Sequence, residues 1–394
     1  MLLNNTPVAR KRNDRIVLVR LLCIFGMIYV HVPLMESASL SGGGSSIAVF
    51  ELLRALLVDG YGRASACLLS IVSGYFVAKT MKGHSPQYSK FFKRRFRSIY
   101  VPMVVWGIVT VIVFSFVSML QTTFLSDACG GDNVWSIDCV NVVLHFSAIS
   151  TGPTMHLAFL RDLFVCMLLA PLLIIVMRHI PMIGLSALAL VYLLDWESML
   201  VLRPLVILGF SVGLTIGLRQ INFTWVDRLW LVWLFSAVLL ALLTTAFNSG
   251  QIPKLQWLFA VNGLDARETL LYPLTRLFGA LAIWSLTLKL MSLRITSWSV
   301  KLEPYLFIAF CSHPLLLSML QELTGLFDIN STFTAFYPIW FVLAPAVSIA
   351  ASVLGMRLCG LLLPNLLQIV SGGRLVQKPK AAVHIDSGEL ATSR

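Results

Sequence analysis

The stretch Arg20–His31, RLLCIFGMIYVH, places an arginine and a histidine at the two ends of ten uncharged residues. On an α-helix, eleven residues make three turns plus about 20°, so both side chains share one face, roughly 16 Å apart. An arginine inside a membrane helix costs about 2.5–3.5 kcal/mol even on the lenient insertion scale. The stripe therefore indicates either a polar cavity within a membrane protein or an interfacial His31 with an Arg20 that extends to the cytoplasmic headgroups.

The composition is that of a polytopic α-helical membrane protein. Of the 394 residues, 58% are hydrophobic and 12% are charged, whereas a soluble domain carries about 25% charged residues. The apolar residues form long runs, so we expect an all-α fold with about ten transmembrane helices of roughly 20 residues each. The expected spans are 16–35, 55–78, 99–120, 158–177, 180–195, 202–218, 229–246, 271–290, 303–322 and 335–356.

The distribution of basic residues predicts the orientation of these spans. With the N-terminus in the cytoplasm, most of the 30 Lys and Arg residues fall in the short inner segments, as the positive-inside rule requires. Both termini are then cytoplasmic. We expect a basic N-terminus over 1–15, a transmembrane domain over 16–357 and a partly disordered cytoplasmic tail over 358–394. The net charge of +12 follows from this asymmetry and does not indicate nucleic acid as a partner.

The stretch KFFKRRFRSIYVP (90–102) lies at the inner entrance to the third expected span. Arg94 and Arg97 are three residues apart, so on a helix they could form a fork that binds phosphate groups. The alternative is an ordinary basic flank that contacts anionic lipid headgroups.

The second expected span carries two further candidates. Ser73 and Gly74, in SIVSGYF at its inner end, allow close backbone approach of a ligand, but such small residues also simply pack helices. Arg63, near its outer start, is either part of a substrate site or a side chain that reaches the headgroups.

Two other histidines fall within expected spans or at their ends. His156 lies at the outer mouth of the fourth span, and His313 lies about midway along the ninth. A histidine at that depth faces the bundle interior, either as a functional group or as a structural hydrogen-bond partner. Arg161 and Asp162 follow just inside the fourth span. Because adjacent helical positions do not face each other, we expect these two to pair with other helices.

Cys129 and Cys139 lie together in a polar loop, SDACGGDNVWSIDC. They would form a disulfide if that loop faces an oxidising compartment, and two free thiols are the alternative. The sequence contains no metal-ligand spacing, phosphate-binding loop or nucleophile elbow. The remaining His, Arg, Ser and carboxylate side chains limit the chemistry to acid–base or transfer reactions.

Taken together, these stretches resemble the acyltransferase-3 family of integral membrane O-acyltransferases. The family's motifs match at Arg20–His31 (a basic residue, ten residues, then His), Ser73–Tyr75 (S-G-[FY]), Arg94–Arg97 (R-x-x-R), His156–Leu160 (H-L-W-F-L) and Phe310–Leu315 (F-x-x-H-P-L). The chain departs from the pattern at Ala158, where an aromatic residue is usual. The resemblance extends over about 15–357.

The resemblance implies a membrane enzyme that moves an acyl group, acetyl or succinyl, from cytoplasmic acyl-CoA to a hydroxyl of a surface or exported polysaccharide. It implies the bacterial inner membrane as the location. The implied partners are acyl-CoA, a lipid-linked or exported glycan and membrane lipids, without a metal or nucleic acid. A polysaccharide exporter or flippase, and a non-catalytic membrane component of glycan assembly, are the alternatives.

The resemblance also implies roles for the matched residues. His31 is expected to be the general base that deprotonates the sugar hydroxyl, and a covalent acyl-His31 intermediate is equally compatible with the sequence. Arg20 is expected to line the channel of the pantetheine arm. Glu36 completes this catalytic group by orienting the imidazole, with Glu51 and Asp59 as equal candidates. The expected acyl-CoA contacts are Arg94, Arg97, Arg20, Ser73 and Gly74. The expected substrate contacts are Arg63, His156 and His313.

Overall fold

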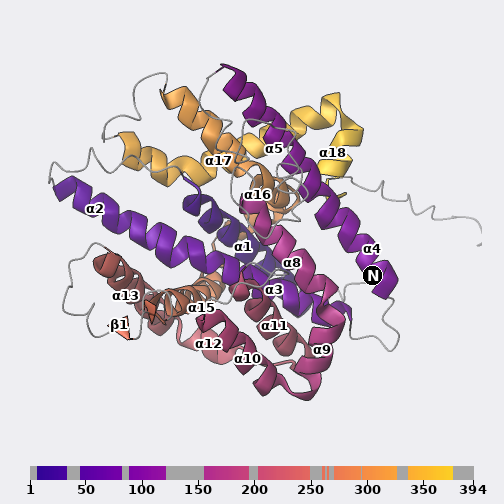
Figure 1. Cartoon of the computed structure of the whole chain (residues 1–394), viewed down its shortest axis with the longest axis vertical. Helices are drawn as coiled ribbons and strands as arrows, with labels where there is room; N and C mark the ends of the chain where they lie inside the picture. Colours follow the sequence, from indigo (N-terminus) through magenta and orange to yellow (C-terminus); the bar gives the residue numbers. More distant parts are fainter. Residues whose placement is uncertain are drawn as a thin grey trace, which may run out of the picture.

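The computed structural model describes residues 7–32, 45–81, 88–120, 155–194, 203–248, 260–261, 264–265, 270–293, 295–325 and 336–375. Within these residues the chain is helical apart from one short antiparallel hairpin (Figure 1). The α-helices are α1 (Pro7–Val30), α2 (Ser45–Arg54), α3 (Arg63–Thr80), α4 (Tyr88–Arg95), α5 (Val101–Leu120), α8 (Ala158–Leu168), α9 (Ala170–His179), α10 (Pro181–Leu193), α11 (Pro204–Arg219), α12 (Thr224–Arg228), α13 (Trp230–Asn248), α15 (Tyr272–Leu290), α16 (Ile295–Gly325), α17 (Phe336–Leu362) and α18 (Pro364–Val370). The other elements are the π-helical segments η2 (Ala55–Gly62) and η3 (Phe96–Tyr100), the 3₁₀ turn η4 (Met155–Leu157), and the strands β1 (Ala260–Val261) and β2 (Leu264–Asp265).

Several helices are long and apolar enough to cross a membrane. Among the described residues, four stretches qualify by length and composition, namely Val49–Thr80, Tyr88–Val113, Thr296–Leu320 and Tyr337–Leu362. A fifth results if α8 and α9, which are bent by 63° at a short break, form one broken span. The described chain is therefore an all-helical bundle with several candidate membrane spans, in agreement with the all-α expectation.

The expected span 158–177 is bent rather than straight. Pro171 stands at the start of α9, and a proline has no N–H to donate to the preceding turn, while its ring clashes with the carbonyl group four residues earlier. The helix direction therefore changes at Leu169, between α8 and α9.

Helix α1 lies inside the bundle. It packs against α3, α15, α16 and α17. In Figure 1 it runs near the centre, with α5, α17 and α18 on one side and α10, α12 and α13 on the other. Leu18, Val19, Cys23 and Ile28 are fully buried. The apolar residues of the Arg20–His31 stretch thus pack against other helices, and this packing holds the two polar ends in fixed places.

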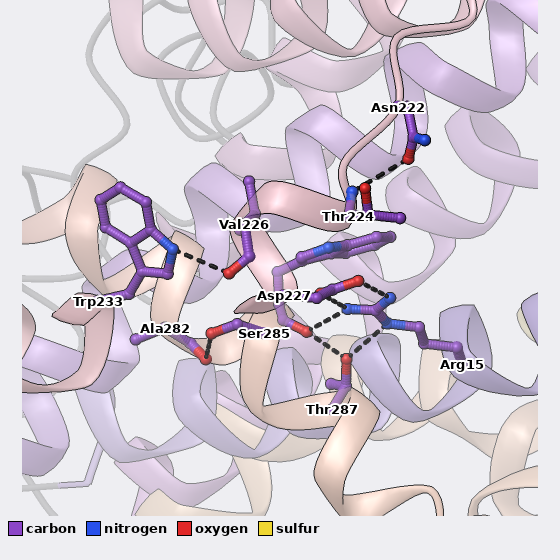
Figure 2. A network of polar contacts seen from close by, with 10 residues as sticks. Arg15, Asn222, Thr224, Val226, Asp227, Trp233, Ala282, Ser285 and Thr287 are labelled. Atoms are coloured by element: carbon purple, nitrogen blue, oxygen red, sulfur yellow. Dashed lines mark hydrogen bonds and ion pairs between the residues drawn. The ribbon is translucent and has the colours of Figure 1, made fainter. Parts of the chain in front are cut away.

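An ion pair fixes the N-terminal half of α1 (Figure 2). Arg15 makes a two-point ion pair with Asp227 of α12, at 2.9 and 2.5 Å, and only 12% of the Arg15 side chain is exposed. The same guanidinium donates to Thr287 Oγ1 and to the Trp284 carbonyl oxygen of α15, and it lies 4.1 Å from the Trp284 ring centre. Separating this buried pair would leave an uncompensated charge, which is costly. The pair and its hydrogen bonds therefore hold α1, α12 and α15 together.

Helices α3 and α11 approach each other closely through glycines. A Cβ atom at Gly74 would lie 1.9 Å from the carbonyl oxygen of Phe210, and one at Gly213 would lie 1.9 Å from that of Ile71. Small residues let two backbones touch, and this close packing is a main attraction between helices in lipid. Of the two roles that the sequence left open for Gly74, the structure supports helix packing.

We expect Gly213→Ala to destabilise the protein, because the new methyl group would overlap the Ile71 carbonyl oxygen and force α3 and α11 apart. Overpacking of this kind costs about 1–3 kcal/mol, and thermal unfolding of the purified protein in detergent measures it. Gly355→Ala is the matched control: its Cβ meets nothing within 4 Å, and alanine stabilises a helix by roughly 0.5–1 kcal/mol relative to glycine. Equal melting temperatures for the two variants would contradict the close contact.

Candidate active site

Three histidines from distant parts of the sequence meet near the end of α1. His31 follows the last residue of α1, His156 lies on η4, and His313 lies in the middle of α16. The ring centres of His31 and His313 are 5.1 Å apart, those of His156 and His313 are 5.5 Å apart, and those of His31 and His156 are 6.3 Å apart. The sequence places each of them in a candidate site, and the fold gathers them into one histidine cluster.

Backbone carbonyl groups fix the hydrogen bonding of the two buried imidazoles. His156 Nε2 lies 3.0 Å from the Cys311 oxygen, and His313 Nδ1 lies 2.6 Å from the Phe310 oxygen. Since a carbonyl oxygen can only accept, both of these nitrogens carry the proton. His313 Nε2 then keeps a lone pair; this atom is buried and has no hydrogen-bond partner among the described residues. Buried polar atoms are seldom left so, and this nitrogen is available to accept a hydrogen bond from a ligand.

Arg20 forms an ion pair with Glu303 of α16, with 3.0 Å between Nη1 and Oε1. His31 lies eleven residues after Arg20, and His313 lies ten residues after Glu303. The two helices therefore run parallel, with the ion pair at one end of their contact and the imidazoles at the other. The two charged side chains are 38% and 44% exposed, so a ligand can reach them. Sequence reasoning missed Glu303, although its spacing to His313 nearly repeats that of Arg20 to His31.

A basic pocket of about 880 Å³ opens beside α4. None of its described lining residues is acidic. Its basic residues are Lys90, Lys93, Arg94, Arg95, Arg97 and Arg374. Arg94 and Arg97, the expected phosphate fork, are exposed. Arg95, which sequence reasoning missed, is half-buried, and its Nε has no hydrogen-bond partner among the described residues. The pocket is therefore suited to an anionic ligand.

The segment after α18 closes one side of the basic pocket. Arg374 donates to the Ser98 carbonyl oxygen at 3.0 Å, and its guanidinium lies 3.8 Å from the Phe307 ring centre. Gly372 has a φ of +60°, which favours glycine, and a Cβ there would lie 2.6 Å from the same Ser98 oxygen. Burial lowers the pKa of Arg374 to about 10, so this side chain is charged at neutral pH. The described part of the expected tail 358–394 thus packs on the bundle and helps to form the pocket.

A second cavity, of about 380 Å³, adjoins His31. Its lining residues include Arg63, Arg203, Arg276 and Tyr192, and we call it the arginine cavity. Arg276 Nη1 donates to the Tyr192 hydroxyl over 3.4 Å. Arg63 is an expected substrate contact, whereas sequence reasoning assigned no role to Arg203 and Arg276. Each of these stands alone in its own stretch, so only the fold shows that they meet.

The carboxylates expected to orient His31 have other partners or lie outside the described residues. Glu51 pairs at 2.8 Å with the arginine three residues further along the chain, and Asp59 pairs with Arg63 at 3.0 Å. Glu36 lies outside the described residues. The role of Glu36 in orienting His31 therefore stays a prediction.

Ser73 and Gly74 are absent from the described residues that line the basic pocket. Ser73 Oγ donates to the Leu69 oxygen at 2.8 Å, and Gly74 packs on α11. Local hydrogen bonding and helix packing account for both positions, and their contact with acyl-CoA stays a prediction.

Arg161 and Asp162 pair with each other, with 2.6 Å between Nη2 and Oδ1. The two adjacent side chains thus meet, because the long arginine side chain folds back along the helix to its neighbour, and their pairing with other helices stays a prediction. Cys129 and Cys139 lie outside the described residues. Within the described part of the chain, no group of three or more His, Cys, Asp or Glu side chains is arranged to hold a metal ion.

Comparisons with known proteins identify the family of the chain. The family model described as an acyltransferase domain, that of the acyltransferase-3 family, matches residues 13–357. The succinoglycan biosynthesis protein ExoH of Rhizobium meliloti is 27% identical over 374 residues, which cover 93% of this chain and 94% of that protein. No solved structure matches the chain. The matched region contains the histidine cluster, the Arg20–Glu303 pair and the expected phosphate fork, and the chain therefore belongs to the acyltransferase-3 family of integral membrane acyltransferases.

Proposed function

We propose that this protein moves an acyl group from cytoplasmic acyl-CoA to a hydroxyl of a surface or exported polysaccharide. The observation that carries the proposal is the parallel pairing of α1 and α16, which joins the Arg20–Glu303 pair to the histidine cluster. One end of this pairing lies near the basic pocket, because Arg374, which lines that pocket, stacks on the ring of Phe307, four residues from Glu303 on α16. The other end adjoins the arginine cavity at His31. A polysaccharide acceptor is in keeping with the name of the R. meliloti relative, a succinoglycan biosynthesis protein.

We further propose ten spans in the bacterial inner membrane, with both termini in the cytoplasm. The segments 90–97 and 368–374, both expected inside, meet at the basic pocket. Arg63, Arg203 and Arg276, which the proposed topology puts toward the outer ends of the expected spans 55–78, 202–218 and 271–290, meet at the arginine cavity. Helices α1 and α16 are parallel, as a first and a ninth span must be. These three agreements support the orientation.

In this proposal the basic pocket holds the phosphate groups of CoA. Arg94 and Arg97, which are exposed, bind the phosphates at the surface of the pocket. Arg95, which is half-buried, binds them deeper in the pocket through the guanidinium whose Nε has no hydrogen-bond partner among the described residues. The pantetheine arm, roughly 15–20 Å long, then follows α1 past Arg20, since the rise from Arg20 to His31 is roughly 16 Å. The thioester arrives at the histidine cluster while the nucleotide stays at the cytoplasmic mouth.

His31 acts as the general base in this arrangement. It removes the proton from the acceptor hydroxyl, the hydroxyl oxygen attacks the thioester carbon, and the CoA sulfur leaves with the proton that His31 returns. His313 has its Nδ1 proton held by the Phe310 carbonyl group. Its bare Nε2 accepts a hydrogen bond from the neighbouring imidazole or from the acceptor hydroxyl and so positions the proton transfer.

We expect His31→Ala to slow acyl transfer by about 10²- to 10⁴-fold, the usual contribution of a general base. Transfer from radiolabelled acyl-CoA to purified glycan by the protein in nanodiscs measures the rate. His179→Ala is the control, because His179 is an exposed histidine at the end of α9. A wild-type rate for His31→Ala would remove this residue from the catalytic role. Movement of glycan across the membrane without acylation would favour the exporter alternative.

The double variant Arg94→Lys, Arg97→Lys separates a phosphate site from a lipid flank. Lysine keeps the charge that lipid headgroups require but lacks the planar fork that binds phosphate at two points. Losing such charge-assisted hydrogen bonds should weaken acyl-CoA binding about tenfold to hundredfold. Arg95→Gln should cause a loss of similar size, because its guanidinium also lines the pocket.

Calorimetric titration of the protein in nanodiscs with a non-hydrolysable acyl-CoA analogue measures these affinities. Arg178→Lys, an exposed basic flank on α9, is the matched control and should bind as the wild type does. If the double variant and Arg95→Gln both keep wild-type affinity, the CoA phosphates bind elsewhere.

A further inference from the structure

The arginine cavity carries more positive charge than the transfer of a neutral acyl group to a neutral sugar requires. It brings Arg63, Arg203 and Arg276 to one space of about 380 Å³ beside His31. None of the described residues that line this space is acidic. Guanidinium groups gathered in a confined space repel one another and lose hydration, so a bound anion stabilises the arrangement.

The arginines of the cavity are compensated to different degrees. Arg63 pairs with Asp59 at 3.0 Å, and Asp59 lines an adjoining cavity of about 200 Å³. That charge is therefore balanced from outside the arginine cavity. Arg276 donates to the Tyr192 hydroxyl at 3.4 Å, and it forms no ion pair with any carboxylate of the described residues.

The backbone adds to the positive potential. Arg203 directly precedes α11, and the first turn of that helix, Pro204–Val206, forms part of the cavity wall. The N-terminal end of a helix carries a partial positive charge, and α11 is 16 residues long. The volume of the cavity lies within the range of small-molecule sites.

We infer that the arginine cavity binds a carboxylate carried by one of the two reactants, held by Arg203 and Arg276 while His31 acts on the neighbouring bond. The inference rests on the proposed acyl transfer and adds the chemical class of the reactant. Because the cavity adjoins His31, the anion lies only a few bonds from the reacting carbon. Among the parts of the reactants near that carbon, the acyl chain and the sugar ring are the ones that carry carboxylates. The planar carboxylate also matches the guanidinium fork.

Two sources could supply this carboxylate: a donor derived from a dicarboxylic acid, or an acceptor that contains a uronic acid. The first arm compares succinyl-CoA with butyryl-CoA as donors, since both acyl chains have four carbons and differ in the terminal carboxylate. The second arm uses butyryl-CoA throughout and compares glucuronide with glucoside acceptor oligosaccharides. A preference for succinyl-CoA over butyryl-CoA means that the donor supplies the carboxylate. A preference for the glucuronide over the glucoside means that the acceptor supplies it.

In the arm that matches, the wild-type protein should favour the carboxylate-bearing reactant in kcat/KM by about tenfold to hundredfold. Arg276→Gln should bring this ratio close to one. Arg54→Gln is the matched control, because Arg54 lies at the same end of the bundle, pairs with Glu51 and lines the adjoining cavity instead. It should keep the wild-type ratio. A wild-type ratio near one in both arms would overturn the inference, as would a preference that Arg276→Gln leaves intact.

A binding measurement separates failure of this inference from failure of the proposed function. We expect succinate or glucuronate to raise the thermal unfolding midpoint of the wild-type protein in nanodiscs by mass action, and to leave that of Arg276→Gln unchanged. Butyramide, glucose and inorganic phosphate are the comparison solutes. An equal rise with phosphate, or no rise with either carboxylate, would refute the carboxylate site. Absence of acyl transfer with every reactant pair would refute the proposed function alone. If Arg276→Gln does not fold, Arg203→Gln serves for the same comparisons.

Discussion

The high cost of an unpaired charge within a membrane determines how this molecule is built. Arg15 reaches Asp227 and Arg20 reaches Glu303, each across two helices that are far apart in the sequence. These contacts fix α1 against α12 and α16, and so they set the position of His31 at its end. The cations of the described chain fall into two groups on this basis. One group meets carboxylates across helix contacts, as Arg15 and Arg20 do, and the other lines the basic pocket and the arginine cavity, whose described lining residues include no carboxylate.

The two cavities stand at opposite ends of one helix contact. The Arg20–His31 rise of roughly 16 Å is about half the thickness of a bilayer core of roughly 30 Å. For the proposed reaction, the basic pocket and the arginine cavity therefore have to reach into the bundle from its two sides, and the flexible arm covers the distance between them. The acyl group alone travels through the bundle on its flexible arm. The π-helical segment beside α5 and the turn at Gly372 shape the basic pocket, whereas the ends of α3, α11 and α15 shape the arginine cavity.

Much of the site could be predicted from the sequence because its parts are local patterns. Arg20 and His31 share a helical face by simple periodicity, and His156 and His313 stand in recognisable motifs. The residues that sequence reasoning missed have no such local signature. Glu303 can be recognised only through its partner Arg20, which is 283 residues away in the sequence. Arg276 can be recognised only through the cavity that it shares with Arg203.

The departures from expectation have similar causes. Helical periodicity predicts the direction in which a side chain leaves the backbone. It does not predict where the guanidinium at the end of a long side chain lies, as the contact between Arg161 and Asp162 shows. The bend before α9 could have been predicted from Pro171, which lies within the apolar run. A hydropathy average over about 20 residues does not detect a single proline. The described helices support several spans, and counting ten of them relied on hydropathy and on charge asymmetry between loops.

The parallel pairing of α1 with α16 has a consequence for how the protein is made. Glu303 is synthesised 283 residues after Arg20, and at roughly 5–20 residues per second the ribosome needs about 15–60 s to reach it. During that interval the first helix leaves the insertion machinery with its arginine unmatched and its histidine without neighbours. The nascent chain must therefore keep α1 beside the translocon, or beside early helices such as α3, until the ninth expected span arrives. The candidate active site can therefore form only after α16 is made, because a chain truncated before that helix lacks both the carboxylate partner of Arg20 and His313.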